Sequence, residues 1–177
     1  PLEIVRTEAR LRGEGFGEAE LIIRRFNFAG SAKLLPETDG GFDLILADLG
    51  VSSMQLDDPS RGFTFKTEGP LDLRLNPQRG QPASALLRTL SEKDLEAMLR
   101  LHSDEPYALA IAKAVFQSRA AISTTTALAE VVRRALGRIS RDMEESEITR
   151  SIRRTFQALR IEVNDEFSAL EQFLRNL

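Results

Sequence analysis

The sequence contains no cysteine, and its 177 residues include a single histidine, His102. Without cysteine the chain can form no disulfide, no thiolate nucleophile and no cysteine-ligated zinc site. One imidazole is too few for a histidine metal cage, and it argues strongly against a Ser-His-Asp triad within the chain. Any chemistry therefore depends on carboxylates, amides, hydroxyls, Arg, Lys or the backbone.

Long apolar runs are also absent, since no uninterrupted stretch approaches the ~20 residues that span a bilayer. With 42% hydrophobic and 29% charged residues, the chain can bury a core of about one domain. No basic-then-apolar signal segment opens the sequence, which together with the missing cysteine predicts a cytoplasmic protein without membrane contact. The net charge of -3 argues against indiscriminate nucleic-acid binding, but such an average can hide local basic clusters.

The first third of the sequence has the pattern of an α/β unit. Residues 2–11 carry apolar side chains at helical spacing. Residues 21–28 and the apolar run 42–48 predict two strands, with a short helical turn between them. In a parallel sheet ligands bind beyond the carboxyl ends of the strands, so a site is expected around Phe28 and residues 48–50.

Residues 51–82 are rich in proline and glycine and predict turns rather than helices or strands. Idle connections of about thirty residues are uncommon in compact domains. The segment is therefore either a disordered linker or a loop that wraps a ligand site. Its apolar residues Phe63, Phe65 and Leu71 favour the second alternative.

The sequence beyond residue 82 predicts helices throughout. Ser91 is an N-cap candidate, and Asp94 is placed to complete a capping box. The longest pattern runs from Ile148 to Leu174 and keeps one apolar stripe for about seven turns, which predicts a single core-packing helix. The shorter predicted helices cover residues 83–90, 91–101, 106–119 and 126–137, the last ending at a Gly137 stop signal.

A local basic cluster lies between Arg133 and Arg160, where eight arginines outnumber four acids. The planar arginine fork donates two parallel hydrogen bonds to a phosphate, so the cluster is a candidate RNA contact. Arg138 and Arg141 fit a solvated helical face with acidic partners one turn away. The RNA contact is assigned instead to four arginines with no acid among them, for which a solvated face is the alternative: Arg150, Arg153, Arg154 and Arg160.

Four segments follow one another in a specific order: residues 48–58 (DLGVSSMQLDD), 61–65 (RGFTF), 69–74 (GPLDLR) and 154–161 (RTFQALRI). Together they resemble the bacterial 16S ribosomal RNA (cytosine-N4)-methyltransferase family, the RsmH or MraW family, over the whole chain. The resemblance implies an α/β fold, with part of a Rossmann-like class I methyltransferase sheet and an inserted all-helical domain. It also implies S-adenosyl-L-methionine as cofactor and, as target, N4 of a cytosine in the decoding region of small-subunit ribosomal RNA.

The resemblance divides the chain into three parts. Residues 1–82 are expected to hold part of the methyltransferase core and the ligand loop, residues 83–160 the inserted RNA-recognition domain, and residues 161–177 a helix returning to the core. The family's glycine-rich first motif would precede this sequence, so a middle fragment is expected. The alternative function is a catalytically silent RNA-binding or assembly module. The expected partner is the small-subunit ribosomal RNA of the 30S subunit, and a homodimer is a further expectation.

Methyl transfer from a sulfonium to an amine is an in-line displacement that needs positioning and little acid-base work. Acceptors that hold the N–H bonds of the cytosine amine would localise its lone pair on nitrogen. Asp48 and Gly50, through its carbonyl, are the catalytic candidates for this role. The resemblance places Phe28 beside the cofactor's adenine, Asp48 near its amino-acid end and Gln55 at the pocket, so Asp48 has two candidate roles. Core packing is the alternative for Phe28, and a solvated loop position is the alternative for Gln55.

Clustered carboxylates in the same region raise the question of a metal site, which this displacement does not need. Asp57, Asp58 and Asp72 are interpreted as N-caps and as ion-pair partners of Arg61 and Arg74. No metal is therefore expected.

The remaining special side chains are interpreted structurally. His102 is expected at a helix C-terminus, where a basic group is favourable. Tyr107 and Phe116 are expected in the core, with stacking on a flipped base as the alternative for an exposed aromatic ring.

Overall fold

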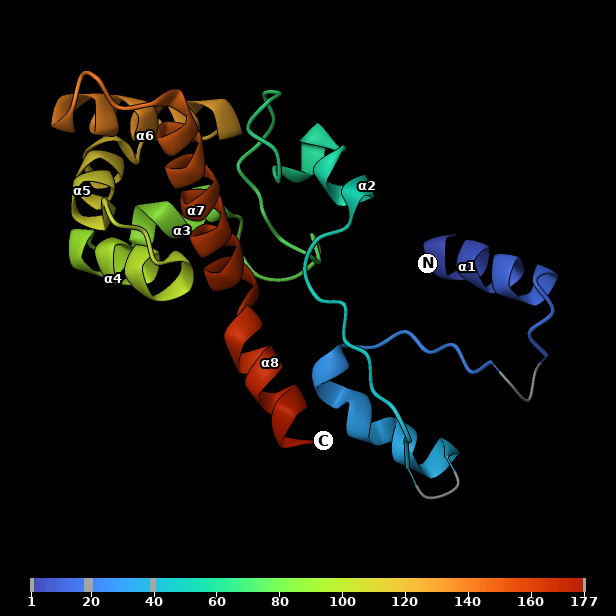
Figure 1. Cartoon of the computed structure of the whole chain (residues 1–177). Coiled ribbons are helices and arrows are strands. Elements are labelled where there is room, and N and C mark those ends of the chain that lie inside the picture. Colours follow the sequence, from blue (N-terminus) through green and yellow to red (C-terminus); the bar gives the residue numbers. More distant parts are fainter. Residues whose placement is uncertain (1, 18–20, 39–40, 177) are drawn as a thin grey trace. The chain divides into compact units, whose positions relative to one another are not determined.

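The computed structural model describes residues 2–17, 21–38 and 41–176, and its regular structure is helical (Figure 1). Within these ranges no β-strand forms, and an isolated bridge joins Pro70 to Thr124. The elements in chain order are α1 (Leu2–Gly13), the 3-10 helix η1 (Phe28–Glu37), α2 (Ser53–Leu56), the 3-10 turn η2 (Pro59–Arg61), α3 (Ala83–Thr89), α4 (Glu92–Ser103), α5 (Ala108–Ser118), α6 (Thr125–Ile139), α7 (Glu145–Asn164) and α8 (Glu166–Arg175).

The chain divides into two compact units. The first comprises Pro1–Ile45 with Ser168–Leu177, and the second, called the helical unit below, comprises Leu46–Phe167. In the first unit α1 confirms the predicted N-terminal helix. The Phe28 and Phe173 rings pack edge to face with centroids 5.7 Å apart, so η1 is attached to α8.

The two predicted strands do not form in the described part of the chain. Phe28 begins η1, and the side chain of Asn27 caps it by accepting a hydrogen bond from the Ala29 N–H at 3.0 Å. In the second segment the apolar side chains of Leu44 and Leu46 are 84% and 89% exposed. A strand is defined by ladder hydrogen bonds to a neighbour, and no described segment pairs with either one. The predicted α/β sheet is therefore not formed by these residues.

The four shorter helices predicted after residue 82 are confirmed as α3 to α6. The Ser91 hydroxyl accepts a hydrogen bond from the Asp94 N–H at 3.2 Å, which completes the predicted cap of α4. Gly137 does not stop α6, which continues to Ile139. Glycine inside a helix costs only about 1 kcal/mol relative to alanine, and the fully buried Leu136 anchors this end of α6.

The predicted single long helix is wrong at Asp165, where a left-handed φ of 50° separates α7 from α8. Asn164, the last residue of α7, is bound to another part of the chain. Its Oδ1 accepts from the Leu75 N–H at 2.7 Å, and its Nδ2 donates to the Leu73 carbonyl at 2.7 Å. Aspartate enters the left-handed region more readily than most residues. A tertiary contact therefore accompanies the end of a helix that apolar spacing alone would continue.

The long loop, residues 57–82, belongs to the helical unit and packs against the rest of it. The Leu71 N–H donates to the Ser123 carbonyl, and the Thr125 N–H donates to the Gly69 carbonyl, each at 2.9 Å. Leu71 and Leu73 are each only 1% exposed. These contacts exclude the disordered-linker alternative.

The core of the helical unit lies between α3–α7 and the long loop. Tyr107 and Phe116 are half-buried and pack against it, as predicted. His102 lies in the last turn of α4, also as predicted, and its Nε2 is 2.8 Å from a carboxylate oxygen of Glu162. Among the helices of the described ranges, none has the length and apolar character needed to cross a membrane.

Candidate functional site

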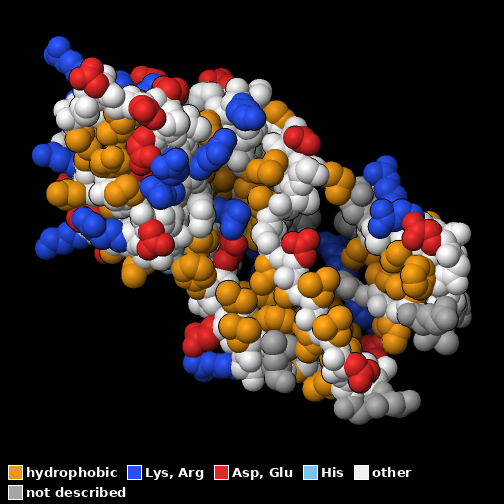
Figure 2. Space-filling model, in the orientation of Figure 1, with side chains coloured by type: hydrophobic (Ala, Val, Ile, Leu, Met, Phe, Trp, Pro, Cys, Tyr) orange, Lys and Arg blue, Asp and Glu red, His pale blue; other side chains and the backbone are white. Residues whose placement is uncertain are grey.

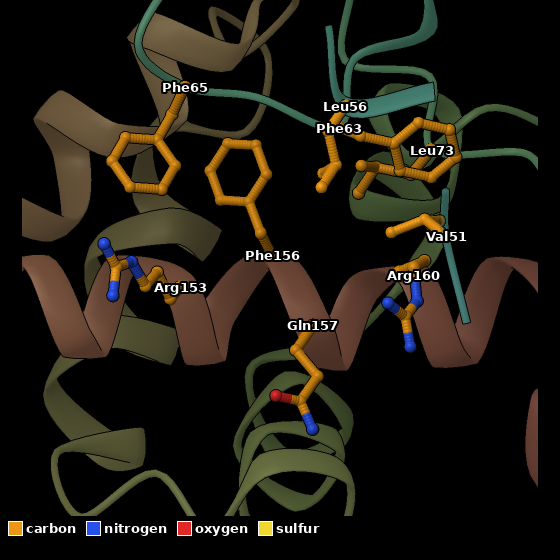
Figure 3. Close-up of a pocket in the computed structure, with 9 residues that line it drawn as sticks. All are labelled: Val51, Leu56, Phe63, Phe65, Leu73, Arg153, Phe156, Gln157 and Arg160. Atoms are coloured by element: carbon orange, nitrogen blue, oxygen red, sulfur yellow. The ribbon is translucent and has the colours of Figure 1, made fainter. Parts of the chain in front are cut away.

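A pocket of about 150 Å³ lies between the long loop and α7 (Figure 3). Every one of the four segments singled out in the sequence contributes to it. Val51 and Leu56 come from the first segment, and Leu73 comes from the third. The other lining residues are Phe63, Phe65, Arg153, Phe156, Gln157 and Arg160. Segments that are about a hundred residues apart in the chain thus form one site.

The interior wall of the pocket is aromatic. Phe156 points from α7 toward the loop, where its ring lies 5.5 Å from the Phe65 ring at an interplanar angle of 51° (Figure 3). Phe63 is 8% exposed, and the guanidinium of Arg61 lies over its ring at 5.7 Å. The wall is therefore held in place by packing before any ligand arrives.

The sharp turn of the RGFTF segment requires glycine. Gly62 has a φ of 75°, and a Cβ on it would lie 2.4 Å from the Pro70 carbonyl oxygen. L-residues are disfavoured at this φ, and the approach leaves no room for a side chain. Gly62 thus lets the second and third segments pack against each other behind the pocket.

The rim of the pocket is polar and cationic. Arg153, Gln157 and Arg160 are spaced along one face of α7, since residues three and four apart are neighbours on a helix. The guanidinium of Arg160 donates two hydrogen bonds to Glu166, at 2.7 and 3.1 Å. Arg153 is exposed and forms no hydrogen bond or ion pair with the described residues. One rim cation is thus paired and the other is available.

The other two predicted RNA contacts lie outside the pocket lining. Arg150 is 2.7 Å from a carboxylate oxygen of Glu147, and Arg154 is 4.0 Å from the other. No acid lies among the four arginines in the sequence, but Glu147 and Glu166, just outside the stretch that contains them, pair with three of the four in the fold. Exposed pairs of this kind are weak. On the face in Figure 2, Lys and Arg side chains lie on the helical unit beside hydrophobic ones.

The residues predicted to hold the cofactor are distributed over both units. Phe28 belongs to the first unit and is half-buried against Phe173, which agrees with the packing alternative. Asp48, Gly50 and Gln55 belong to the helical unit. The Asp48 carboxylate is exposed and has no hydrogen-bond or ion-pair partner among the described residues.

Gly50 and Gln55 are placed by the backbone around α2. Gly50 has a φ of 122°, and nothing lies within 4 Å of the position a Cβ would take. The Gln55 amide oxygen accepts from the Ser52 N–H at 2.9 Å, so this side chain orders the turn that begins α2.

The acidic residues of the loop serve structure. Two Ser60 groups donate to Asp58, the hydroxyl at 2.6 Å and the N–H at 2.9 Å, and both lower the pKa of Asp58 below its ordinary value. The Arg74 guanidinium donates to Asp72 at 2.7 and 2.8 Å and lowers the pKa of that carboxyl. Within the described ranges no group of three or more His, Cys, Asp or Glu side chains could hold a metal.

Asn164, which connects α7 to the backbone behind the pocket, escaped the sequence interpretation. Arg61 was expected to pair with the loop carboxylates, but its guanidinium donates to the Arg74 and Leu75 carbonyls at 2.9 and 3.0 Å. No local signal indicates a hydrogen bond that spans 91 residues of sequence.

Helices, an aromatic pocket and a cationic rim together define a helical domain suited to planar, anionic ligands. The chain belongs to the MraW methylase family, whose sequence profile matches residues 6–177. It is 48% identical over 180 residues to the ribosomal RNA small subunit methyltransferase H 1 of Lachnoclostridium phytofermentans, covering 100% of this chain and 49% of the relative. It is 48% identical over 179 residues to the methyltransferase H 2 of Alkaliphilus metalliredigens, covering 99% and 51%.

A more distant relative has the same name without a number and is also matched over most of this chain. The ribosomal RNA small subunit methyltransferase H of Deinococcus deserti is 40% identical over 167 residues, which cover 93% of this chain and 53% of the relative. The chain spans about half the length of the curated relatives it matches.

Proposed function

We propose that this protein methylates N4 of a cytosine in the decoding region of 16S ribosomal RNA, with S-adenosyl-L-methionine as the methyl donor. The observation that carries the proposal is the convergence of all four family-like segments on one pocket. Relatives named as ribosomal RNA small subunit methyltransferases agree with it. The class I methyltransferase sheet is part of the proposal, because the family match supports it.

The residues present fit such a cofactor by their chemistry. When bound, S-adenosyl-L-methionine supplies an electrophilic methyl group on a sulfonium. An unpaired carboxylate at Asp48 suits either the cofactor's ammonium or the amine to be methylated. Gln55, ordered by its hydrogen bond to Ser52, and the Phe28 ring are proposed as further cofactor contacts because the family resemblance assigns them that role.

The proposed catalytic contribution of this chain is to orient the nucleophile. The lone pair of a cytosine amine is shared with the ring, so acceptors for its N–H bonds favour attack by nitrogen. We assign this role to the Asp48 carboxylate and the Gly50 carbonyl. Open space around Gly50 allows a base to approach its backbone closely.

RNA binding is assigned to the arginines of α7. Arg153 and Arg160 lie on the pocket rim, and Arg150 and Arg154 extend the same basic helix. We further infer that residues 83–160 form the RNA-recognition domain, and that residues 1–82 and 161–177 belong to the methyltransferase core. The proposed setting is the cytoplasm, the proposed partner is the 30S subunit, and a homodimer is a separate prediction.

Methyl transfer to small ribosomal subunits tests the proposal. Purified protein is incubated with 30S subunits that lack the modification and with cofactor carrying a labelled methyl group. The RNA is then digested to nucleosides for mass spectrometry. We expect the label in N4-methylcytidine from the decoding region. Label at another position would refute the proposed target, and RNA binding without label would favour a silent RNA-binding module.

A further inference from the structure

A second pocket of the helical unit lies between α5 and α6, outside the four segments that carry the family resemblance. Its volume is about 90 Å³. Polar residues dominate its mouth: Arg134 and Arg138 from α6, and Gln117 and Ser118 from α5. None of these residues lines the pocket beside α7.

The two arginines are one helical turn apart on α6. Side chains at this spacing are neighbours, and like charges there repel each other. Arg138 was expected to have an acidic partner one turn away, yet it forms no hydrogen bond or ion pair with the described residues. Arg134 is 61% exposed, and its Nε lies 3.5 Å from a carboxylate oxygen of Glu130, one turn earlier on the same face of α6. Exposed pairs at this spacing are weak. The pocket therefore has one unpaired cation, Arg138, and one weakly paired cation, Arg134.

Every polar group at this pocket can donate a hydrogen bond, and no acidic side chain lines it. Guanidinium groups donate only, while the Gln117 amide and the Ser118 hydroxyl can each donate to the same ligand. The floor consists of Ala114, Val131 and Ala135, which leave room for a compact group. Small apolar walls with converging donors suit a tetrahedral oxyanion.

We propose that this pocket binds one backbone phosphate of the RNA substrate. The choice of RNA rests on the proposed function, since RNA is the phosphate-bearing partner that function requires. Phosphate contacts of this kind position a protein on nucleic acid without reading its sequence. The pocket thus adds an anchoring point separate from the one on α7.

Each arginine also has a structural explanation. Arg138 lies in the last turn of α6, where a cation interacts favourably with the helix dipole, and Arg134 pairs with Glu130. These explanations do not account for the donors that α5 contributes. They predict lower melting temperatures for the arginine variants and unchanged RNA binding.

The salt dependence of RNA binding tests the proposal. The protein is titrated with a single-stranded RNA from the decoding region at several salt concentrations, with R134Q, R138Q and the double variant. If both arginines hold one phosphate, each variant loses the same single contact. The slope of log K against log salt should then fall by roughly 0.7–0.9 in all three. The control is R88Q/K93Q, which removes two exposed charges from α3 and α4 outside both pockets and should leave the slope closer to wild type.

Competition with inorganic phosphate tests whether the pocket binds a phosphate of RNA or a small free anion. We expect millimolar phosphate to compete with RNA for the wild type more than for the double variant at equal ionic strength. An unchanged slope in the double variant, or an equal loss in the control, would overturn the proposal. Phosphate-dependent stabilisation without any change in RNA slope would also overturn it, in favour of a small-anion site. Binding is measured without methyl transfer, so failure of the proposed enzymatic function leaves this result interpretable.

Discussion

At the scale of single residues, ion pairs in the fold distinguish arginines that have the same predicted role in the sequence. Arg153 and Arg160 both line the rim of the α7 pocket, but Glu166 holds Arg160 through two hydrogen bonds. A ligand phosphate would have to compete with that carboxylate at Arg160, whereas Arg153 has no partner to release among the described residues. Arg153 is therefore the stronger candidate for a direct RNA contact.

Replacing Arg153 with Gln should weaken RNA binding and reduce its salt slope by roughly 0.7–0.9, the loss of one phosphate contact. Cofactor affinity should be unchanged, because Arg153 is not one of the proposed cofactor contacts. Fluorescence anisotropy across a salt series measures this. Arg88→Gln, which removes an exposed charge from α3, is the control. If the Arg153 variant keeps the wild-type salt slope of RNA binding, Arg153 belongs to a solvated helical face and does not contact RNA.

Asp48 allows binding to be separated from chemistry. Asp48→Asn keeps the size of the side chain and removes its charge, so loss of an aimed electrostatic contact should lower the maximal rate by ~100-fold. If Asp48 mainly holds the cofactor's ammonium, cofactor affinity should fall first, and saturating cofactor should restore most of the rate. Single-turnover rates and cofactor titration distinguish the two roles. Values within about twofold of wild type for both quantities would remove Asp48 from the site.

At the scale of elements, local signals and tertiary contacts compete at particular positions. The Ser91–Asp94 cap was predictable because its two side chains and two N–H groups are close in sequence. The end of α7 was not, because the apolar stripe continues past Asp165 while Asn164 is bound by the long loop. The path of the long loop depends on hydrogen bonds such as that from the Leu71 N–H to the Ser123 carbonyl. The turn-forming residues of the loop do not predict these distant partners.

Gly62→Ala should destabilise the helical unit more than Gly80→Ala. Both glycines have a positive φ, 75° and 71°, so both variants carry a similar backbone penalty of about 1 kcal/mol. Only at Gly62 would the new Cβ meet a backbone oxygen, at 2.4 Å, whereas nothing lies within 4 Å at Gly80. We expect the Gly62 variant to lose at least ~2 kcal/mol in urea unfolding. An equal loss of unfolding free energy in the two variants would show that the long loop can shift to accommodate the new Cβ at residue 62.

At the scale of the whole molecule, the buried core is concentrated in one unit. The residues of the main hydrophobic cluster, from Phe63 to Leu159, all lie within Leu46–Phe167. By contrast, the apolar side chain of Leu44, in the first unit, is 84% exposed. Apolar burial supplies most of the driving force for folding, so the helical unit has what independent folding requires.

A fragment of residues 46–167 should therefore fold alone. We expect a helical circular dichroism spectrum and a cooperative urea transition, because the core and the packed loop are both retained. Leu99→Ala, which truncates a side chain that is 2% exposed, should lower the unfolding free energy by about 2–5 kcal/mol in that fragment. A non-cooperative transition in the unmutated fragment would show that the core needs the rest of the chain.

The sequence by itself determined the family, the four helices α3 to α6 and the impossibility of a disulfide within the chain, since it has no cysteine. These follow from residue identity, helical spacing and capping, all of which act within a few positions of the chain. The predicted strands did not form, because a strand depends on a partner that its own residues do not provide. Only the tertiary structure decided which arginines are paired, where α7 ends, and that four distant segments form one pocket. Each of these depends on contacts between residues far apart in sequence, such as Leu73 with Asn164, which local patterns do not specify.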